Sequence, residues 1–256
     1  MRFYVFKVNN LFKYTFIMLL TAVLATVFVY SKEEVMTVFQ PKRNLPIYSV
    51  DYPDDKIALT FDCAWGSDDI PHILNTLKEH DVRATFFIVG LWAKKYPDAV
   101  KMISNGGHDI ANHSYSHLRM GCIDNNRIRS EILKCGEVLK DITSKDVDLF
   151  RAPYGDYNNN VIRIARELNH YSIQWDVDSL DWKPGITPEQ IQNRVLKNVK
   201  RGSIVLFHND TSYTAKILPD LITALKNKGY GFIPVSEMIM RDSYDIDHTG
   251  RQKKKQ

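Results

Sequence analysis

Residues 56–62 read KIALTFD, an apolar run that ends in a carboxylate. A short apolar run of this kind is typical of a strand that is buried on both faces, as the strands of parallel sheets are. Similar runs recur downstream and alternate with amphipathic stretches of ~10–15 residues, which is the pattern of β-α units. About seven such units favour a distorted or incomplete (β/α) barrel over an open doubly wound sheet. We therefore expect an α/β fold built around the strand at residues 56–61.

The boundaries of the expected elements follow from periodicity and from helix-ending signals such as Gly106-Gly107. Strands are expected at residues 56–61, 84–90, 108–113, 147–150, 170–175, 203–208 and 231–233, and helices at 68–80, 96–105, 124–143, 158–168, 187–201, 213–228 and 235–240. We predict a folded domain at 55–240, a linker with three prolines at 32–54, and a polar, basic and disordered tail at 241–256.

The N-terminal segment, residues 1–31, combines basic residues with an uncharged stretch at 14–30, YTFIMLLTAVLATVFVY. Three interpretations are open: an uncleaved transmembrane anchor, a cleaved signal peptide and a buried core helix. The stretch is close to the ~20 apolar residues of a membrane helix, and only Val29-Tyr30-Ser31 offers a weak cleavage site. The anchor is therefore favoured. Anchor and signal both place the folded domain outside the cytoplasm, with the membrane as a partner of the N-terminal segment.

Composition and cysteine content limit the partners. The net charge is +4, and much of the excess lies at the two ends of the chain. A nucleic-acid site would need Lys and Arg clustered on the folded body, so we expect no nucleic-acid partner, and we expect a monomer. Cys63, Cys122 and Cys135 are odd in number and form no CxxC motif, which argues against a disulfide framework. Cys122 and Cys135 could pair, but buried thiols are favoured.

Reactive side chains follow the ends of the expected strands. Asp62 follows the strand at 56–61, His113 follows 108–112, Arg151 follows 147–150 and His208 closes 203–207. Asp181 comes shortly after the strand at 170–175. Catalytic residues of (β/α) barrels lie at the carboxyl ends of the strands, so we expect these side chains to share one face of the barrel.

Each candidate has a chemical and a structural interpretation. His113 and His117 have the i, i+4 spacing that can bring two imidazoles to one metal ion, or they are two surface histidines. Asp62 could act as a general base and His208 as a general acid, although a histidine at the end of an apolar strand can also be a core residue. Asp181 is the best candidate to orient the His208 ring, and Arg151 could keep a carboxylate ionised or form a structural ion pair.

Aromatic residues accompany these positions, among them Trp65, Tyr154 and Trp182. Aromatic faces stack on the apolar faces of sugars, so a groove lined in this way suits a glycan, whereas the alternative is core packing.

Five segments resemble the motifs of the polysaccharide deacetylase family and follow one another in the family's order. They are TFD at 60–62, HSYSH at 113–117, RAPYG at 151–155, DSLDW at 178–182 and LFH at 206–208. This family is the NodB-homology domain, or carbohydrate esterase family four, and the resemblance covers about residues 55–240. The N-terminal anchor and the segment TFDCAWG look most like those of the PdaB-like sporulation branch. The resemblance implies a distorted (β/α) barrel that hydrolyses N-acetyl groups of glucosamine or muramic acid polymers with a divalent metal, zinc being the expected ion.

The resemblance also assigns roles to residues. Asp62 matches the general base, His208 the general acid, His113 and His117 the metal ligands, and Arg151 the partner of the base. Asp181 matches the residue that orients the acid, Trp182 a wall of the acetyl pocket, and Tyr154 the position whose backbone N–H binds the oxyanion. Trp65 is a further expected glycan contact.

One position departs from the family pattern. Metal-dependent members have a second Asp, a metal ligand, directly after the base, and this chain has Cys63 there. A cysteine thiolate is an acceptable zinc ligand, but a buried cysteine usually packs as a small apolar residue. Cys63 is therefore either the third ligand or a residue that points away from the metal.

Three functions remain open. A metal-dependent deacetylase acting on cell-wall glycan is favoured, because the base, the acid and the arginine are all present. A glycan-binding domain without turnover is the alternative, because the usual metal carboxylate is missing. An intracellular zinc hydrolase of small amides conflicts with the N-terminal segment.

Overall fold

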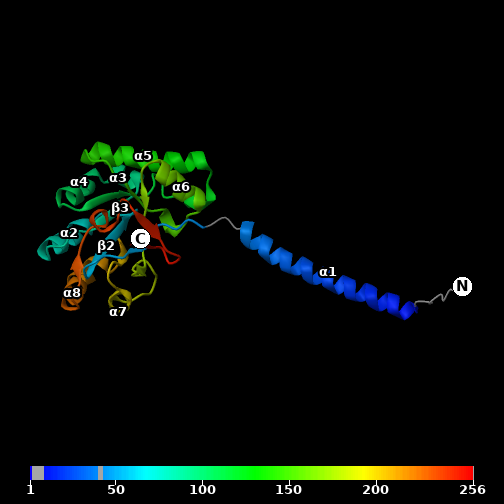
Figure 1. Cartoon of the computed structure of the whole chain (residues 1–256). Coiled ribbons are helices and arrows are strands. Elements are labelled where there is room, and N and C mark those ends of the chain that lie inside the picture. The colour runs from blue at the N-terminus through cyan, green and yellow to red at the C-terminus, as the bar shows by residue number, and fades with distance from the viewer. Residues whose placement is uncertain (2–8, 40–42, 256) are drawn as a thin grey trace. The chain divides into compact units, whose positions relative to one another are not determined.

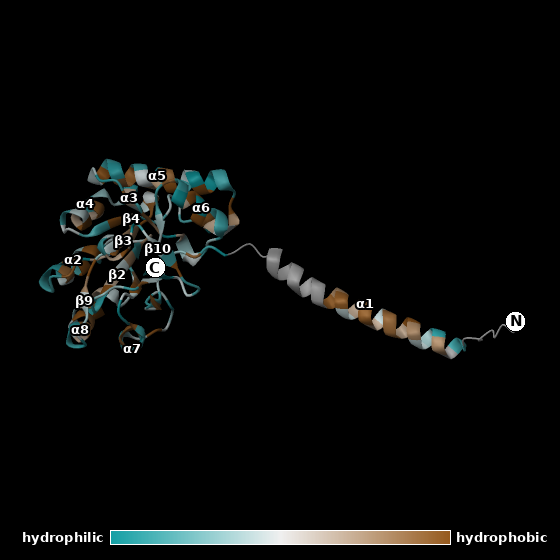
Figure 2. Ribbon diagram, viewed as in Figure 1, coloured by the Kyte–Doolittle hydropathy of each residue, from teal (hydrophilic) through white to brown (hydrophobic). Residues whose placement is uncertain are grey.

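The computed structural model describes Met1, Asn9–Phe39 and Arg43–Lys255. The chain forms two compact units, Met1–Arg43 and Asn44–Gln256. The first unit consists of helix α1 (Asn10–Phe39), in which Phe12–Val29 has a mean hydropathy of 2.0 and is long and apolar enough to cross a membrane. Figure 2 shows these apolar residues as the brown part of α1. By length and composition, this helix suits a membrane anchor or a signal sequence.

Strand β2 (Lys56–Cys63) is the centre of the main sheet of the second unit. It pairs in parallel with β3 (Thr85–Ile88) on one side and with β8 (Ile204–His208) on the other. All of its residues after Lys56 are buried, which explains the continuous apolar run. The whole sheet has the order β6-β5-β4-β3-β2-β8-β7, and β9 pairs with the start of β2. The remaining strands are β4 (Asp109–Asn112), β5 (Leu149–Phe150), β6 (Tyr171–Ser172), β7 (Val177–Asp178) and β9 (Gly231–Phe232).

The sheet curls but does not close, because β6 and β7 form its two ends and do not pair with each other. The segment before β2 lies at this gap. The N–H of Ile47 donates to Ser172 O at 2.8 Å, and the N–H of Val50 donates to Gly202 O at 2.9 Å. The predicted incomplete (β/α) barrel is thus confirmed, and the chain that precedes the central strand covers the opening.

Helices surround the sheet (Figure 1). Several begin where the sequence supplies a cap: the Asp124 side chain accepts from the N–H groups of Asn126 and Arg127, and Thr187 and Gln190 form a capping box. The helices are α2 (Ile70–Glu79), α3 (Gly90–Lys95), α4 (Pro97–Asn105), α5 (Asn125–Thr143), α6 (Asn159–Glu167), α7 (Pro188–Asn198), α8 (Thr214–Asn227) and α9 (Val235–Met238), with 3-10 turns η1 (Met120–Cys122) and η2 (Pro153–Gly155).

The predicted disordered tail is wrong, because residues 241–256 include two strands. β11 (Arg251–Lys254) pairs with β10 (Tyr244–Ile246) and, in parallel, with β1 (Ser49–Val50). Gln252 is fully buried there, and its amide accepts from Met240 N–H and donates to Met240 O. The tail and the second half of the predicted linker are therefore parts of the folded unit.

Smaller differences concern single elements. Helix α3 was not expected. Of the strand predicted at 170–175, only Tyr171–Ser172 forms a strand (β6), and β7 (Val177–Asp178) begins after the predicted range. All three cysteines are free thiols, and Cys122 is exposed, which contradicts the prediction that it is buried.

Candidate active site

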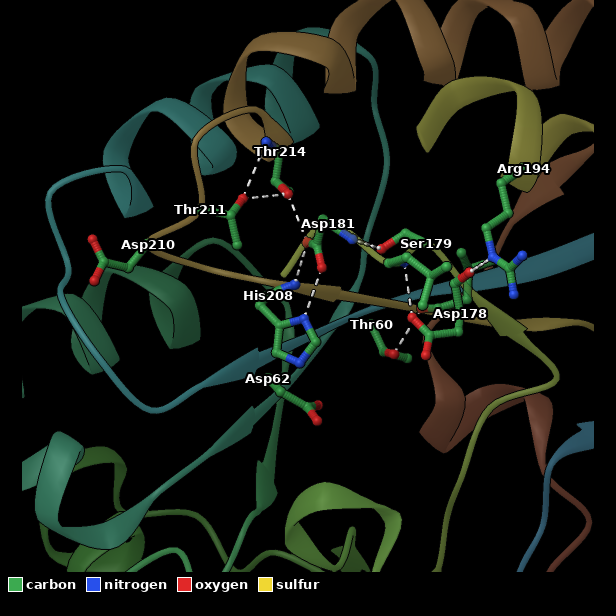
Figure 3. Close-up of polar contacts among 12 residues, drawn as sticks. Thr60, Asp62, Asp178, Ser179, Asp181, Arg194, His208, Asp210, Thr211 and Thr214 are labelled. Carbon is green, nitrogen blue, oxygen red and sulfur yellow. Dashed lines mark hydrogen bonds and ion pairs between the residues drawn. The ribbon is translucent and has the colours of Figure 1, made fainter. Parts of the chain in front are cut away.

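The side chains expected at the strand ends do meet at the carboxyl edge of the sheet. The parallel register of β2 and β8 places Asp62 directly beside His208, and the close-up in Figure 3 draws the two side chains next to each other. His113 follows β4, and Arg151 follows β5. Four strands therefore contribute one reactive side chain each to the same edge.

Asp62 forms a buried ion pair with Arg151. Arg151 Nη1 donates to Asp62 Oδ1 at 2.6 Å and to Thr60 Oγ1 at 3.0 Å, while Nη2 donates to Gln174 O at 3.2 Å. Burial alone would raise the pKa of the Asp62 carboxyl, but the charge and the hydrogen bond of Arg151 hold that pKa below its usual value. Asp62 is therefore ionised at neutral pH, which is the state that a general base requires.

His113 and His117 face each other with their ring centroids 5.1 Å apart. The Nδ1 atom of His113 lies 2.8 Å from Arg151 O, and Nδ1 of His117 lies 3.1 Å from the Tyr154 hydroxyl. Burial lowers the pKa of His113, and it lowers the pKa of His117 to about 3. Both rings are therefore neutral. The bonds at Nδ1 leave each Nε2 for another partner, as in the histidines that bind metals, and Nε2 of His113 already lies 3.4 Å from Asp62 Oδ2.

The segment that carries the two histidines is held by buried polar groups. Ser114 and His117 have positive φ angles of 64° and 58°. The side-chain oxygen of Asn112 accepts from Ser114 N–H at 2.9 Å, and Glu131 on α5 accepts from both N–H and Oγ of Ser116 at 2.7 Å. Glu131 is 1% exposed, so a buried carboxylate fixes this loop. Glu131 lies on the same helix face as Ile128 and Cys135, so its spacing indicates a buried position, whereas its charged side chain suggests the surface.

Cys63 does not join the two histidines. Its side chain is fully buried in the apolar cluster that also contains Leu59 and Phe61. Because side chains alternate along a strand, Cys63 faces away from the side on which Asp62 lies. Burial also raises the pKa of the thiol well above its usual value, so the thiolate that a metal would need is disfavoured.

The residues around the two histidines form an incomplete set of ligands for a metal ion. Within Met1, Asn9–Phe39 and Arg43–Lys255, no group of three or more His, Cys, Asp or Glu side chains is arranged to hold one. The paired neutral imidazoles of His113 and His117 fit as ligands, whereas Cys63 does not fit as the third. The interpretation in which Cys63 points away is the one that agrees with the geometry.

His208 is held by Asp181, as expected. Its Nδ1 lies 2.8 Å from Asp181 Oδ1, and its backbone N–H donates to Asp181 Oδ2 at 2.7 Å. Burial acts to lower the pKa of the imidazole, but the hydrogen bond and the charge of Asp181, with smaller contributions from Asp62 and Asp178, raise it above its usual value. The ring can therefore carry a proton near neutral pH, with Nε2 directed toward the site.

Exposed aromatic rings border the site. Trp65, Tyr154 and Trp182 are 53%, 54% and 54% exposed, and the rings of Trp65 and His117 form a T-shaped pair with centroids 5.4 Å apart. A cavity of about 470 Å³ beside them is lined by Trp65, Trp182, Asp181 and His208, among others. Large rings that stay in water rather than in the core provide stacking surfaces for a ligand.

The backbone is strained around these side chains. Seven non-glycine residues of the described chain have φ between 55° and 64°; Ser144 and Asn169 lie elsewhere, and five lie in the loops that form the site, namely Ser114, His117, Tyr154, Leu180 and Asp210. Such conformations cost free energy and persist only where surrounding structure enforces them, and they are common at functional sites.

Known proteins share this fold and much of this sequence. A family model described as polysaccharide deacetylase matches residues 49–173. A peptidoglycan-N-acetylglucosamine deacetylase of Bacillus cereus is 37% identical over 75% of this chain and 70% of its own length. The peptidoglycan-N-acetylmuramic acid deacetylase PdaA of Bacillus subtilis is 31% identical over 72% of this chain and 71% of its own length.

Among solved structures, a similar one is a mutant of a CE4 family pseudoenzyme with restored enzymatic activity. It has a TM-score of 0.73 and 37% identity over 75% of this chain and 70% of its own. The match in sequence, in the curled parallel sheet and in the motifs at its carboxyl edge leads to one conclusion: the chain belongs to the polysaccharide deacetylase family.

Proposed function

We propose that the protein hydrolyses N-acetyl groups on a cell-wall polysaccharide of the peptidoglycan type, on glucosamine or muramic acid. One observation carries this proposal: an ionised carboxylate and a histidine that can hold a proton lie in direct register on β2 and β8, beside two neutral imidazoles. The names of the relatives, which are peptidoglycan deacetylases, support the substrate class. The exposed rings of Trp65 and Trp182 provide surfaces on which sugar rings can stack.

The proton transfers follow from the geometry. Asp62 accepts a proton from the attacking water through Oδ2, the oxygen that is not bound to Arg151 and that lies 3.4 Å from His113 Nε2. The positive charge of Arg151 keeps Asp62 ionised before the reaction. His208 holds a proton on Nε2 and passes it to the departing glycan nitrogen as the C–N bond breaks, which releases acetate and leaves a free amine. Tyr154, through its backbone N–H, would stabilise the oxyanion.

We propose that His113 and His117 hold a divalent metal, zinc being the expected ion, without Cys63 as a ligand. Such an ion, when bound, would polarise the amide carbonyl and lower the pKa of water. The two histidines contribute by presenting neutral Nε2 atoms, and their Nδ1 contacts with Arg151 O and the Tyr154 hydroxyl fix the ring orientations.

The setting of the reaction is also proposed. The apolar helix α1 supports a single N-terminal anchor with the folded unit outside the cytoplasm, where peptidoglycan lies. The resemblance to the PdaB-like branch supports a role in sporulation. Protease added to intact cells would then digest the folded unit, whereas a cytoplasmic control protein would survive.

A glycan-binding domain without turnover is the second candidate. It is favoured by Cys63, which occupies the place of the metal carboxylate and is buried away from the histidines. One similar solved structure is described as a pseudoenzyme with activity restored by mutation. The binding domain has no need of the Asp62–Arg151 and His208–Asp181 pairs, so we rank it second.

The deciding experiment measures acetate release by the purified full chain from N-acetylated glycan strands. We expect turnover that Asp62→Asn lowers by about 10²–10⁴-fold. Asp242→Asn, at an exposed position, is the matched control and should behave like the wild type. Chelation and His113→Ala should both lower metal content and rate. Oligosaccharide binding with no acetate released by the wild type would instead establish the binding domain.

A further inference from the structure

Asp181 accepts hydrogen bonds on both of its oxygens. Oδ1 binds Nδ1 of His208, while Oδ2 accepts from the His208 backbone N–H at 2.7 Å and from the Thr214 hydroxyl at 2.6 Å. Thr214 is the first residue of α8 and is fully buried. A hydroxyl in the first turn of a helix therefore reaches the carboxylate that orients His208, as Figure 3 shows.

The direction of these hydrogen bonds is fixed by chemistry. An ionised carboxylate can only accept, so the Thr214 proton must point to Asp181. The Thr211 hydroxyl lies 2.7 Å from the Thr214 oxygen, and since the Thr214 proton is already used, Thr211 must be the donor of that bond. The Thr214 N–H in turn donates to Thr211 Oγ1 at 3.2 Å. The result is a one-way chain from Thr211 through Thr214 to Asp181, in which each bond strengthens the next.

The hydrogen-bond chain from Thr211 through Thr214 to Asp181 restrains a motion that would disturb His208, the rotation of the Asp181 carboxylate. Rotation of the Asp181 carboxylate would move Oδ1 away from the imidazole, but Oδ2 is held by two donors on different elements, His208 N–H on β8 and the Thr214 hydroxyl on α8. A carboxylate fixed in this way keeps the histidine proton on Nδ1 in the neutral ring, so that Nε2 faces the reacting group.

We propose that Thr214 is a positioning residue for the deacetylation proposed above: it locks Asp181 and thereby sets the tautomer and direction of His208. It touches neither substrate nor reacting atoms. Thr211 supports it by donating to its oxygen. This inference rests on the proposed function for its kinetic part, but the state of the His208 ring can be measured without turnover.

The test compares Thr214→Val, which keeps the shape and removes the donor, with Thr214→Ser, which keeps the donor. Thr223→Val is the matched control, because Thr223 is an exposed threonine of the same helix, bound only to Pro219 O in its own preceding turn. The full chain is labelled with nitrogen-15 in its histidines, and the ring signals of His208 are assigned with His208→Gln. Acetate release is measured on the same samples.

In the wild type, Thr214→Ser and Thr223→Val, we expect the neutral His208 ring to carry its proton on Nδ1. In Thr214→Val we expect a mixture of tautomers and a kcat that is roughly tenfold to a hundredfold lower with an unchanged KM. If valine prevents folding, Thr214→Ala is measured instead, with the same expectation.

A Thr214→Val protein with the wild-type tautomer and kcat would overturn the proposal, even if its melting temperature were lower, because it would make Thr214 a helix-start residue only. Loss of kcat in Thr214→Ser equal to that in Thr214→Val would overturn it too. If the wild type releases no acetate, the proposed function fails, but the tautomer measurement still decides the role of Thr214.

Discussion

The buried pair of Asp62 and Arg151 joins the central strand to the end of β5. Arg151 is fully buried, and its guanidinium lies 3.9 Å from the centroid of the Phe87 ring. A charge in such surroundings is tolerated because Asp62, Thr60 and Gln174 accept hydrogen bonds from its two Nη atoms, although the buried Nε has no partner. The ion pair between Asp62 and Arg151 therefore stabilises the fold and also keeps the Asp62 carboxylate ionised.

Arg151→Met should leave Asp62 buried without its cation. We expect the free energy of unfolding to fall by about 3–5 kcal/mol, as when one partner of a buried pair is removed. Arg129→Met removes the exposed pair with Glu167 and should cost less than about 1 kcal/mol. Thermal unfolding followed by tryptophan fluorescence would measure both, and equal effects of the two substitutions would contradict the role assigned to Arg151.

The pH dependence of kcat/KM should report His208 and Asp62. The charge of Arg151 holds the pKa of Asp62 below its usual value, so Asp62 stays ionised around neutral pH and no loss of the base is expected there. His208 acts in its protonated form, and its pKa is raised above the usual value, so activity should fall as pH rises through that raised pKa. Asp181→Asn removes the main charge that raises the pKa of His208 and leaves only the smaller contributions of Asp62 and Asp178 against burial, so it should move this alkaline limb to lower pH. An unmoved limb would mean that another group is the acid.

At the scale of elements, the sequence predicted the helices and the central strand well, because amphipathic periodicity and apolar runs are local signals. It could not predict β10 and β11. RQKK at 251–254 is polar throughout, and Gln252 is buried only because Met240 supplies both of its amide partners. Burial that depends on a distant partner leaves no local pattern.

Gln252→Ala tests this small sheet. The substitution would leave the partly buried N–H and C=O of Met240 without the Gln252 amide, so we expect a loss of about 1–3 kcal/mol of stability. Asn193→Ala removes an exposed amide on α7 and should change stability by less than about 0.5 kcal/mol. Equal melting temperatures for the two variants would show that residues 241–256 are not a structural part of the fold.

The active site was predictable to the extent that its residues follow strand ends. Asp62, His113, Arg151 and His208 were found in this way, since topology alone brings strand ends together. Cys63 shows the limit of the argument: it is adjacent to Asp62 in sequence, but strand alternation places it on the opposite face. Thr214 and Glu131 act through tertiary hydrogen bonds, which no spacing rule indicates.

At the scale of the whole molecule, four histidines that are buried or half-buried link stability to pH. Burial lowers the pKa of His108 to about 4 and of His117 to about 3, and it lowers those of His113 and His170 as well. Below pH 6.5 these histidines bind protons in the unfolded chain but stay neutral in the folded chain, so the free energy of unfolding falls as pH falls. His208, with a raised pKa, acts in the opposite sense but is one residue against four.

The metal-free protein should therefore melt at a lower temperature at pH 5 than at pH 7. The measurement is a series of thermal unfolding curves across this range, with nitrogen-15 titration of the histidines to identify the groups responsible. A melting temperature that is constant or higher at pH 5 would contradict the neutral state assigned to these rings.

The central claim is that the protein breaks an amide bond with water, using Asp62 as base. Its most direct test is to incubate the full chain with an N-acetylated glycan in water enriched in oxygen-18 and to analyse the released acetate by mass spectrometry. The account predicts acetate that carries oxygen-18 for the wild type and almost none for Asp62→Asn. Glycan recovered with all its acetyl groups, or equal labelled acetate from both proteins, would contradict it.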